Sequence, residues 1–303
     1  MAVETFKLSL GPLLFNWPAD TFRDFYFRIA DEADIDIVYL GEVVCTKRRP
    51  FHLVHYEDVL DRLKAAGKQV ILSGLQLVMD GKDMASVEET QGLADDFLIE
   101  ANDMSAVSML RGRPHALGPS INVYNPETLA YFEREGATRI SLNAELPKTT
   151  LAALATAASC DLEVQVFGRA PLAISARCFH ARAHGLSKNG CQYVCDNDPD
   201  GLTLDTLDGQ AFLAVNGLQT LSHKYISLLD ELPALMQMGI RDFRLSPHTG
   251  DMVRVANIFR ARAAEWISAE KARIFLDELL PEAQFSNGFF HSLPGHTRHH
   301  TVE

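Results

Sequence analysis

The sequence predicts an α/β protein folded as a closed (β/α)8 TIM-like barrel, and two observations support this fold. Short apolar runs alternate with stretches of helical period, an order typical of parallel strands joined by right-handed crossovers. Eight such runs fall within about 250 residues, the size expected of one (β/α)8 barrel. An open doubly wound sheet is the alternative, but no glycine-rich dinucleotide loop follows the first run. We therefore expect residues 1–303 to form a single barrel domain.

The predicted strands are apolar runs of five or six residues, and helical patterns lie between most of them. The strands are expected at 6–10, 36–40, 69–73, 97–101, 120–124, 139–143, 162–167 and 242–246. The helical patterns cover 21–33, 56–68, 86–96, 125–137 and 149–159.

The alternation breaks after the seventh strand, between residues 168 and 225. In this region Asn216-Gly217 stands between two apolar runs, which is a strong signal for a type I′ β-hairpin. We therefore expect an insertion at about 169–224, made of a cysteine-bearing loop and a hairpin. The hairpin either docks a partner or folds back over the loop, and the sequence leaves both open.

Composition limits the classes of function. The net charge of -12 disfavours DNA and other nucleic acids as partners. No run of about eighteen apolar residues occurs, so we expect no transmembrane segment. Five cysteines without an export signal argue against a disulfide framework and for a cytoplasmic, reducing location. The polar tail with His296, His299 and His300 is expected to be a solvated end.

The positions of the cysteines on the predicted barrel separate four of them from the fifth. Cys45 follows the second strand, and Cys178, Cys191 and Cys195 follow the seventh. All four therefore leave from the C-terminal face, where barrel proteins place their chemistry. Cys160 precedes the seventh strand on the opposite face and is expected to be a core residue.

Four thiolates from two loops can hold a zinc ion or an iron–sulfur cluster. Zinc sites favour two close cysteine pairs, and only Cys191 and Cys195 form one here, so we favour a [4Fe–4S] cluster. The alternative is a set of unrelated buried thiols. The cations at 47–49, directly after Cys45, either offset the negative charge of a cluster, hold an anionic substrate, or form a solvated loop edge.

Other polar residues stand at the predicted strand ends, where they either line a pocket or satisfy loop backbone. They are Ser73, Glu100, Asn102, Asn122, Tyr124, Asn143, Glu145, Arg244 and Ser246. Glu42 and Glu100 are the best candidates for buried carboxylates. The catalytic residues stay unassigned, because no Ser/His/Asp order, H-E-x-x-H motif or P-loop is present.

Residues 163–178, "EVQVFGRAPLAISARC", resemble the signature of the collagenase-like peptidase family. The matching positions are Glu163, Val164, Val166, Gly168, Ser175, Arg177 and Cys178. Phe167 stands where the family has a histidine, Pro171 where it has its first cysteine, and Ala176 where it has a glycine. Peptide hydrolysis is therefore disfavoured, because the histidine and the first cysteine are its best candidate groups.

Further stretches resemble the ubiquinone-biosynthesis branch of that family, and the resemblance extends from about residue 5 to 290. They are 37–51, 97–112, 118–132, 212–225 and 243–252.

This resemblance implies a [4Fe–4S] cluster on Cys45, Cys178, Cys191 and Cys195, and oxygen-independent hydroxylation of a prenylated aromatic ubiquinone precursor. It also implies a heterodimer with a UbiU-like family member and a UbiT-like lipid-carrier accessory protein. An RNA-base hydroxylation subunit, a zinc-stabilised scaffold and a peptidase-like protein are the alternatives.

Overall fold

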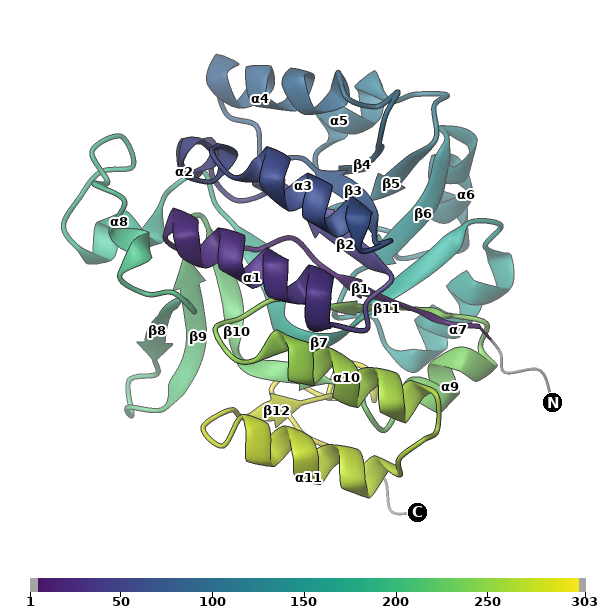
Figure 1. Cartoon of the computed structure of the whole chain (residues 1–303). Helices are drawn as coiled ribbons and strands as arrows, with labels where there is room; N and C mark the ends of the chain where they lie inside the picture. Colours follow the sequence, from purple (N-terminus) through teal and green to yellow (C-terminus); the bar gives the residue numbers. More distant parts are fainter. Residues whose placement is uncertain (1–4, 300–303) are drawn as a thin grey trace.

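Eight parallel strands form a closed ring in the computed structural model, which describes residues 5–299 (Figure 1). They are β1 (Lys7–Leu10), β2 (Ile37–Leu40), β3 (Gln69–Ser73), β4 (Leu98–Ala101), β5 (His115–Leu117), β6 (Ala137–Leu142), β7 (Asp161–Ile174) and β11 (Asp242–Leu245). Each pairs with the next, and β11 closes the ring by pairing in parallel with both β7 and β1. The predicted (β/α)8 barrel is therefore confirmed.

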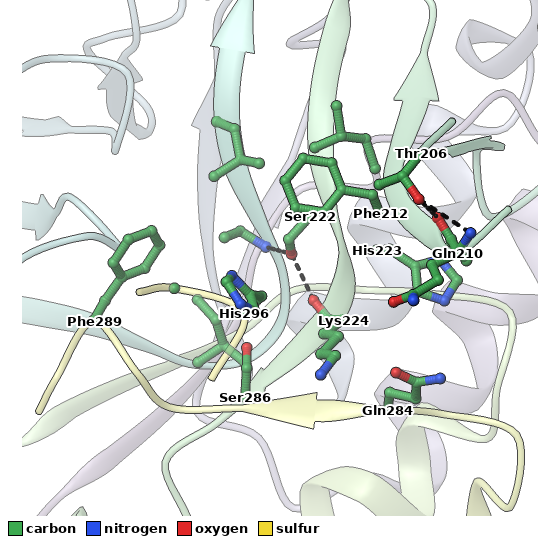
Figure 2. Close-up of a pocket in the computed structure, with 16 residues that line it drawn as sticks. Thr206, Gln210, Phe212, Ser222, His223, Lys224, Gln284, Ser286, Phe289 and His296 are labelled. Carbon is green, nitrogen blue, oxygen red and sulfur yellow. Dashed lines mark hydrogen bonds between the residues drawn. The ribbon is translucent and has the colours of Figure 1, made fainter. Parts of the chain in front are cut away.

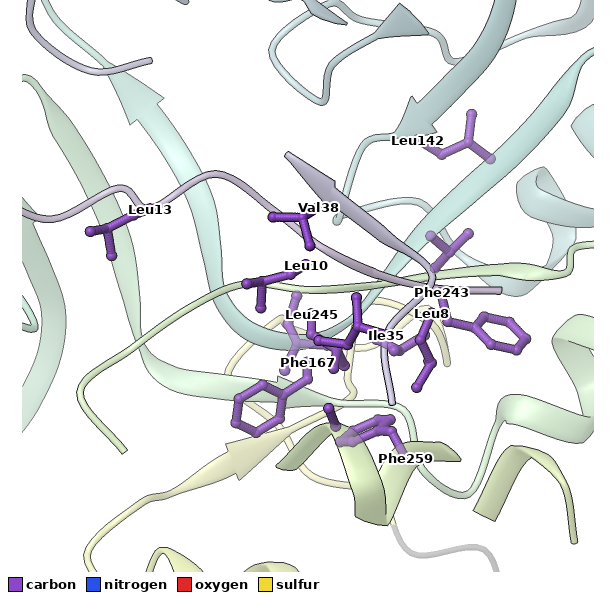
Figure 3. Close-up of a cluster of buried hydrophobic side chains, with 14 of the residues drawn as sticks. Leu8, Leu10, Leu13, Ile35, Val38, Leu142, Phe167, Phe243, Leu245 and Phe259 are labelled. Carbon is purple, nitrogen blue, oxygen red and sulfur yellow. The ribbon is translucent and has the colours of Figure 1, made fainter. Parts of the chain in front are cut away.

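Helices surround the ring, as Figure 1 shows, and all the predicted helical patterns form. Around the barrel lie α1 (Ala19–Glu32), α2 (Arg49–Leu53), α3 (Tyr56–Ala65), α4 (Gly81–Gln91), α5 (Met104–Met109), α6 (Pro126–Arg134), α7 (Lys148–Ala157), α9 (Leu232–Gln237), α10 (Met252–Ala263) and α11 (Ala269–Leu279). Asp80, Asn125 and Ser268 begin α4, α6 and α11 by accepting backbone N–H groups. Leu8, Phe243 and Phe259 belong to the apolar core between helices and strands (Figure 3).

The predicted fifth strand is wrong. β5 is His115–Leu117, whereas 120–124 forms a loop. The sequence of this loop has the alternation of a strand, because Ile121 and Val123 are buried and Asn122 between them is exposed. Its backbone is instead held by the carbonyl of Gly118 and the side chain of Asn143. Alternating burial at the end of the barrel therefore produced a strand pattern without strand pairing.

The insertion after the seventh strand is present and richer than predicted. β7 continues beyond the ring to Ile174 and pairs antiparallel with β10 (Gln219–Ser227). The added elements are α8 (Phe179–Ala183), the 3-10 turn η2 (Val194–Asp196), β8 (Leu202–Asp205) and β9 (Ala211–Asn216). β8, β9 and β10 form an antiparallel sheet, and β12 (Phe285–Ser286) pairs with β10.

The predicted hairpin is confirmed, but its turn differs by one residue. Asn216 pairs with Gln219, so Gly217 and Leu218 are the two central residues. Of these two, only Gly217 has a positive φ, at 62°. A positive φ at the first central position alone is the pattern of a type II′ turn and not of type I′.

The C-terminal end is exposed at His296 and His299, as expected of a solvated end, but hydrogen bonds hold it as far as His299. The side chain of Asn287 bonds to both the N–H and the carbonyl of His299, and its backbone N–H bonds to Thr297. The segment is therefore tied to the strand that precedes it. His300 lies outside the described residues.

The interior of the barrel holds a buried charged network. Arg244 donates to Glu100 at 2.6 Å and to Glu163 at 3.0 Å, and both carboxylates are fully buried. Ser9 and Tyr39 also donate to Glu163, and Ser73 donates to Glu100. Burial raises the pKa of Glu163, but Arg244 and Arg139 outweigh burial and hold it below its usual value.

We predict that Glu163→Gln destabilises the fold by about 3–5 kcal/mol, because it leaves Arg244 and Arg139 without their shared buried anion. Urea unfolding followed by circular dichroism measures this change. Glu89→Gln is the control, since Glu89 is 60% exposed in its pair with Arg49 and should cost less than about 1 kcal/mol. Equal losses in the two variants would contradict the prediction.

Candidate metal centre

Cys45 lies in the loop that follows β2. Glu42 shapes this loop, because its Oε1 accepts the backbone N–H groups of Val44 at 2.8 Å and Cys45 at 2.9 Å. Glu42 is 8% exposed, so its predicted burial is confirmed. This carboxylate acts as a local cap that turns the chain and directs Cys45 toward the insertion.

The other three cysteines lie in the segment between β7 and β8. Cys178 begins α8, and its Sγ accepts the backbone N–H of Ala181 at 3.4 Å. Between Cys191 and Cys195 the backbone of Gln192 and Tyr193 is left-handed, with φ of 48° and 56°. Two consecutive non-glycine residues in this region are strained, and such strain often marks a functional loop.

The structure brings all four predicted cysteines to one pocket. Its lining consists of Cys45, Lys47, Arg48, Cys178, His180, Lys188, Cys191, Tyr193, Val194, Cys195, Gly217 and Leu218. Within residues 5–299, no three His, Cys, Asp or Glu side chains form a group that could hold a single metal ion. Cys160 lies elsewhere, just before β7, where it packs against the main apolar core.

Arg48 is the charged residue at the centre of this region and is only 1% exposed. Its guanidinium donates to the carbonyl of Leu14 at 2.8 Å and to Oδ1 of Asn216 at 2.9 Å. It also faces the thiols of Cys195 and Cys45. The alternative of a solvated loop edge is therefore wrong for Arg48, since it joins three segments of the chain in the interior.

The protonation of the thiols follows from this burial. Burial raises the pKa of Cys45 to about 11, although Arg48 opposes the shift. Burial also raises the pKa of Cys195, again against the effect of Arg48. A buried thiol loses its proton when it binds a metal. Binding of a metal at these thiols would therefore release protons and would strengthen as pH rises.

Two lysines add positive charge to the pocket lining. Lys47 Nζ donates to the carbonyl of Lys188 at 2.6 Å, which ties the loop after β2 to the insertion. Lys188 Nζ lies 3.2 Å from the sulfur of Met79. With Arg48, these cations surround the four thiols and would offset the negative charge of their ionised forms.

The hairpin tip covers this pocket. Gly217 and Leu218 belong to its lining, and Leu218 is 2% exposed. The sequence left two roles open for the hairpin. The structure shows the second for its tip, which folds back over the cysteine loop.

The remaining strand-end residues divide into three groups. Asn102, Arg244 and Ser246 line a small cavity at the barrel mouth, and Ser73 and Glu100 are buried below it. Asn143 holds the 120–124 loop. Tyr124 and Glu145 hydrogen bond to each other at the surface, and Asn122 is exposed.

Sequence reasoning missed several residues of the barrel interior. They are Tyr39, Gln76, Arg139, Glu163 and Gln165. The available signal was a charged residue, Glu163, between the apolar residues Leu162 and Val164 of a predicted strand.

Two signature positions explain how this chain differs from the collagenase-like pattern. Phe167, at the position of the family's histidine, is fully buried and contacts the rings of Tyr225, His248 and Phe259. Pro171, at the first cysteine position, lines the barrel mouth. The side chain of Phe167 therefore serves the core and offers no group for hydrolysis.

The fold and these sites define a (β/α)8-barrel protein with a cysteine-lined pocket beside the C-terminal face of the barrel. The chain belongs to peptidase family U32, the collagenase-like family, which matches residues 22–300.

Solved structures of similar proteins include the U32 peptidase Mk0906. It has 16% sequence identity and a TM-score of 0.48, with 83% of this chain and 95% of that chain covered. The tryptophan synthase complex from Pyrococcus furiosus has 11% identity and a TM-score of 0.43, covering 91% of this chain and 98% of that chain.

Among residues 5–299, no helix is long and apolar enough to cross a membrane.

We predict that Gly217→Ala destabilises the chain more than Gly209→Ala. Both glycines have a left-handed φ, at 62° and 78°, so each alanine costs about 1–2 kcal/mol in the backbone. At Gly217 the new methyl group would also lie 2.6 Å from the Arg48 guanidinium, whereas nothing lies within 4 Å at Gly209. Thermal unfolding of both variants measures the difference, and equal shifts would show that Arg48 does not restrict the hairpin tip.

Proposed function

We propose that this chain is an iron–sulfur subunit of an oxygen-independent hydroxylase system for ubiquinone precursors, the role that its resemblance to UbiV implies. The observation that carries the proposal is the single pocket lined by Cys45, Cys178, Cys191 and Cys195 beside the buried Arg48. These are the four residues that the resemblance assigns to a [4Fe–4S] cluster.

The residues of the pocket suit a cluster in two respects. Four thiols line the same space. A cubane binds each thiolate at a separate iron atom, so its ligands need not converge on one point. The buried guanidinium of Arg48 and the N–H directed at Cys178 would stabilise the negative charge of the bound state.

A cluster held by four cysteines would exchange single electrons and leave no iron obviously open to substrate. The chain's own residues would set the conditions of that exchange. Leu218 and the hairpin tip exclude water, while Lys47, Arg48 and Lys188 favour the more negatively charged oxidation state. Because no iron is open to substrate, we assign the cluster to electron transfer or a structural role. The prenylated substrate would then be held elsewhere on this chain or on a UbiU-like partner.

Exposed apolar side chains beside the pocket support a protein partner. Phe51, Leu53 and Val54 at α2 are 43%, 43% and 69% exposed. Phe51 contacts Tyr193 of the pocket lining, with ring centroids 4.7 Å apart. Phe179, next to Cys178, is 42% exposed. Such a group of apolar side chains is typical of an interaction surface, and we assign it to the UbiU-like protein.

The alternatives are weaker on the same observations. A peptidase role has no support at Phe167, which is fully buried in the core. An RNA-base hydroxylation subunit would need a basic surface, against a net charge of -12.

We predict that changing any one of Cys45, Cys178, Cys191 or Cys195 to Ala lowers iron and sulfide content and bleaches visible absorption. Cys160→Ser is the matched control, because Cys160 lies outside the pocket. Iron, sulfide and zinc are measured after anaerobic purification. Full iron retention in a pocket variant, or iron loss in Cys160→Ser, would contradict the assignment.

We also predict that Val54→Asp weakens co-elution with the UbiU-like protein in size-exclusion chromatography, because it places a charge in the proposed apolar interface. Trp266→Asp is the control, since Trp266 is 73% exposed and follows α10 instead of α2. The iron content of Val54→Asp should stay unchanged. A complex that survives Val54→Asp and dissociates with Trp266→Asp would place the interface elsewhere.

A further inference from the structure

A separate cavity of about 540 Å³ lies on the inserted sheet and includes no cysteine (Figure 2). Residues of β7, β9 and β10 line it, together with the segment around β12. Leu172 of β7, Leu213 of β9 and Ile226 of β10 belong to this lining. Phe289, from the segment after β12, lies at its edge in Figure 2. Its volume is within the range of small-molecule sites, roughly 300–1,000 Å³.

Large apolar side chains in the cavity lining are exposed to solvent. Leu172 is 44% exposed and Phe212 is 50% exposed, although both line a concave surface. Binding becomes more favourable when a ligand removes apolar area of this kind from water. The lining therefore favours a ligand with an extended apolar portion.

The polar part of the cavity has a definite charge. Lys224 contributes an ammonium group from β10, and Figure 2 shows it near Gln284 and Ser286. No carboxylate is among the described lining residues. Asp208 lies outside the lining and is hydrogen bonded to Thr206 and Gln210. On a chain with a net charge of -12, a lining that holds a cation and no carboxylate favours an anionic group over a cationic one.

The two parts come from neighbouring strands of the inserted sheet. Phe212 lies on the upper side of the view in Figure 2, and Lys224 lies below it toward β12. Between them, Ser222 Oγ is occupied by the N–H of Ala170 and the carbonyl of Lys224, so it offers little to a ligand. The lining thus changes from apolar side chains of β7 and β9 to the cationic side chain of Lys224 on β10.

We propose that this cavity binds an amphipathic anion, with an extended apolar chain against Leu172, Phe212 and Leu213 and a carboxylate or similar head group beside Lys224. The proposal is independent of the cysteine pocket. It assigns the inserted sheet a ligand-binding role in addition to carrying the hairpin tip.

Isothermal titration calorimetry tests the proposal with dodecanoate below its critical micelle concentration. Butanoate has the same head group without the tail, and dodecyltrimethylammonium has the same tail with the opposite charge. Dodecanoate should bind saturably at one site and at least roughly tenfold more tightly than either. Titration of 4-octylbenzoate distinguishes a benzoate head from a fatty-acid head, and tighter binding of either one supports an anionic amphiphile.

Lys224→Met should weaken dodecanoate binding roughly two- to fivefold, the effect expected for a partly exposed ion pair. Lys224→Arg should restore it, and Lys148→Met, at an exposed lysine on α7, should leave it unchanged. Leu172→Gln should weaken the binding of dodecanoate without unfolding the chain, because Leu172 is already 44% exposed. Circular dichroism confirms that each variant folds.

Three results would overturn the proposal: no saturable binding of dodecanoate, equal binding of dodecyltrimethylammonium, or equal effects of Lys224→Met and Lys148→Met. Cys45→Ala separates this site from the proposed function. That variant should bind dodecanoate normally whether or not the wild-type chain holds a cluster.

Discussion

The candidate metal centre depends on the interactions that the buried guanidinium of Arg48 makes. A charge that is 1% exposed is costly unless anions or hydrogen bonds compensate it. Leu14 and Asn216 supply two acceptors, and Glu42, Cys45 and Cys195 are the acidic groups that face it. Arg48 therefore joins the loop after β1, the loop after β2 and the inserted hairpin around the cysteines. Ionised, ligand-forming thiols would complete its electrostatic environment.

The barrel provides the frame for this arrangement. Parallel strands place their C-terminal ends on one face, so the loops after β2 and β7 project on the same side although they are distant in sequence. The Arg244–Glu163–Glu100 network holds strands β11, β7 and β4 together inside the ring. Removing Arg244 would leave two buried carboxylates without this cation, and removing either carboxylate would take away one of its two buried anions. This polar interior maintains the strand ends on which the cysteine loops depend.

Much of this frame could be predicted from the sequence because its signals are local. Seven strands follow apolar runs, and Cys45 and Cys178 could be placed on one face from strand order alone. The fifth strand was misplaced because Ile121 and Val123 are buried by a loop that caps the barrel end. Alternating apolar residues in a sequence indicate burial. They do not indicate which segments form hydrogen bonds with each other as strands.

The parts that could not be predicted depend on long-range contacts. The role of Arg48 requires Asn216, which is 168 residues away in sequence. The hairpin turn was predicted from Asn216-Gly217, but pairing shifted its centre to Gly217 and Leu218. The C-terminal segment was expected to be a solvated end and is exposed at His299, yet the side chain of Asn287 holds it there. In each case a single distant side chain decides the local structure.

Mössbauer spectroscopy of the anaerobically purified, ⁵⁷Fe-labelled chain, combined with iron, sulfide and zinc analysis of the same sample, tests the central claim most directly. The account predicts about four iron and four sulfide per chain, with the spectrum of an all-thiolate [4Fe–4S] cluster. One zinc per chain without sulfide, or iron that remains after all four pocket cysteines are changed to alanine, would contradict it.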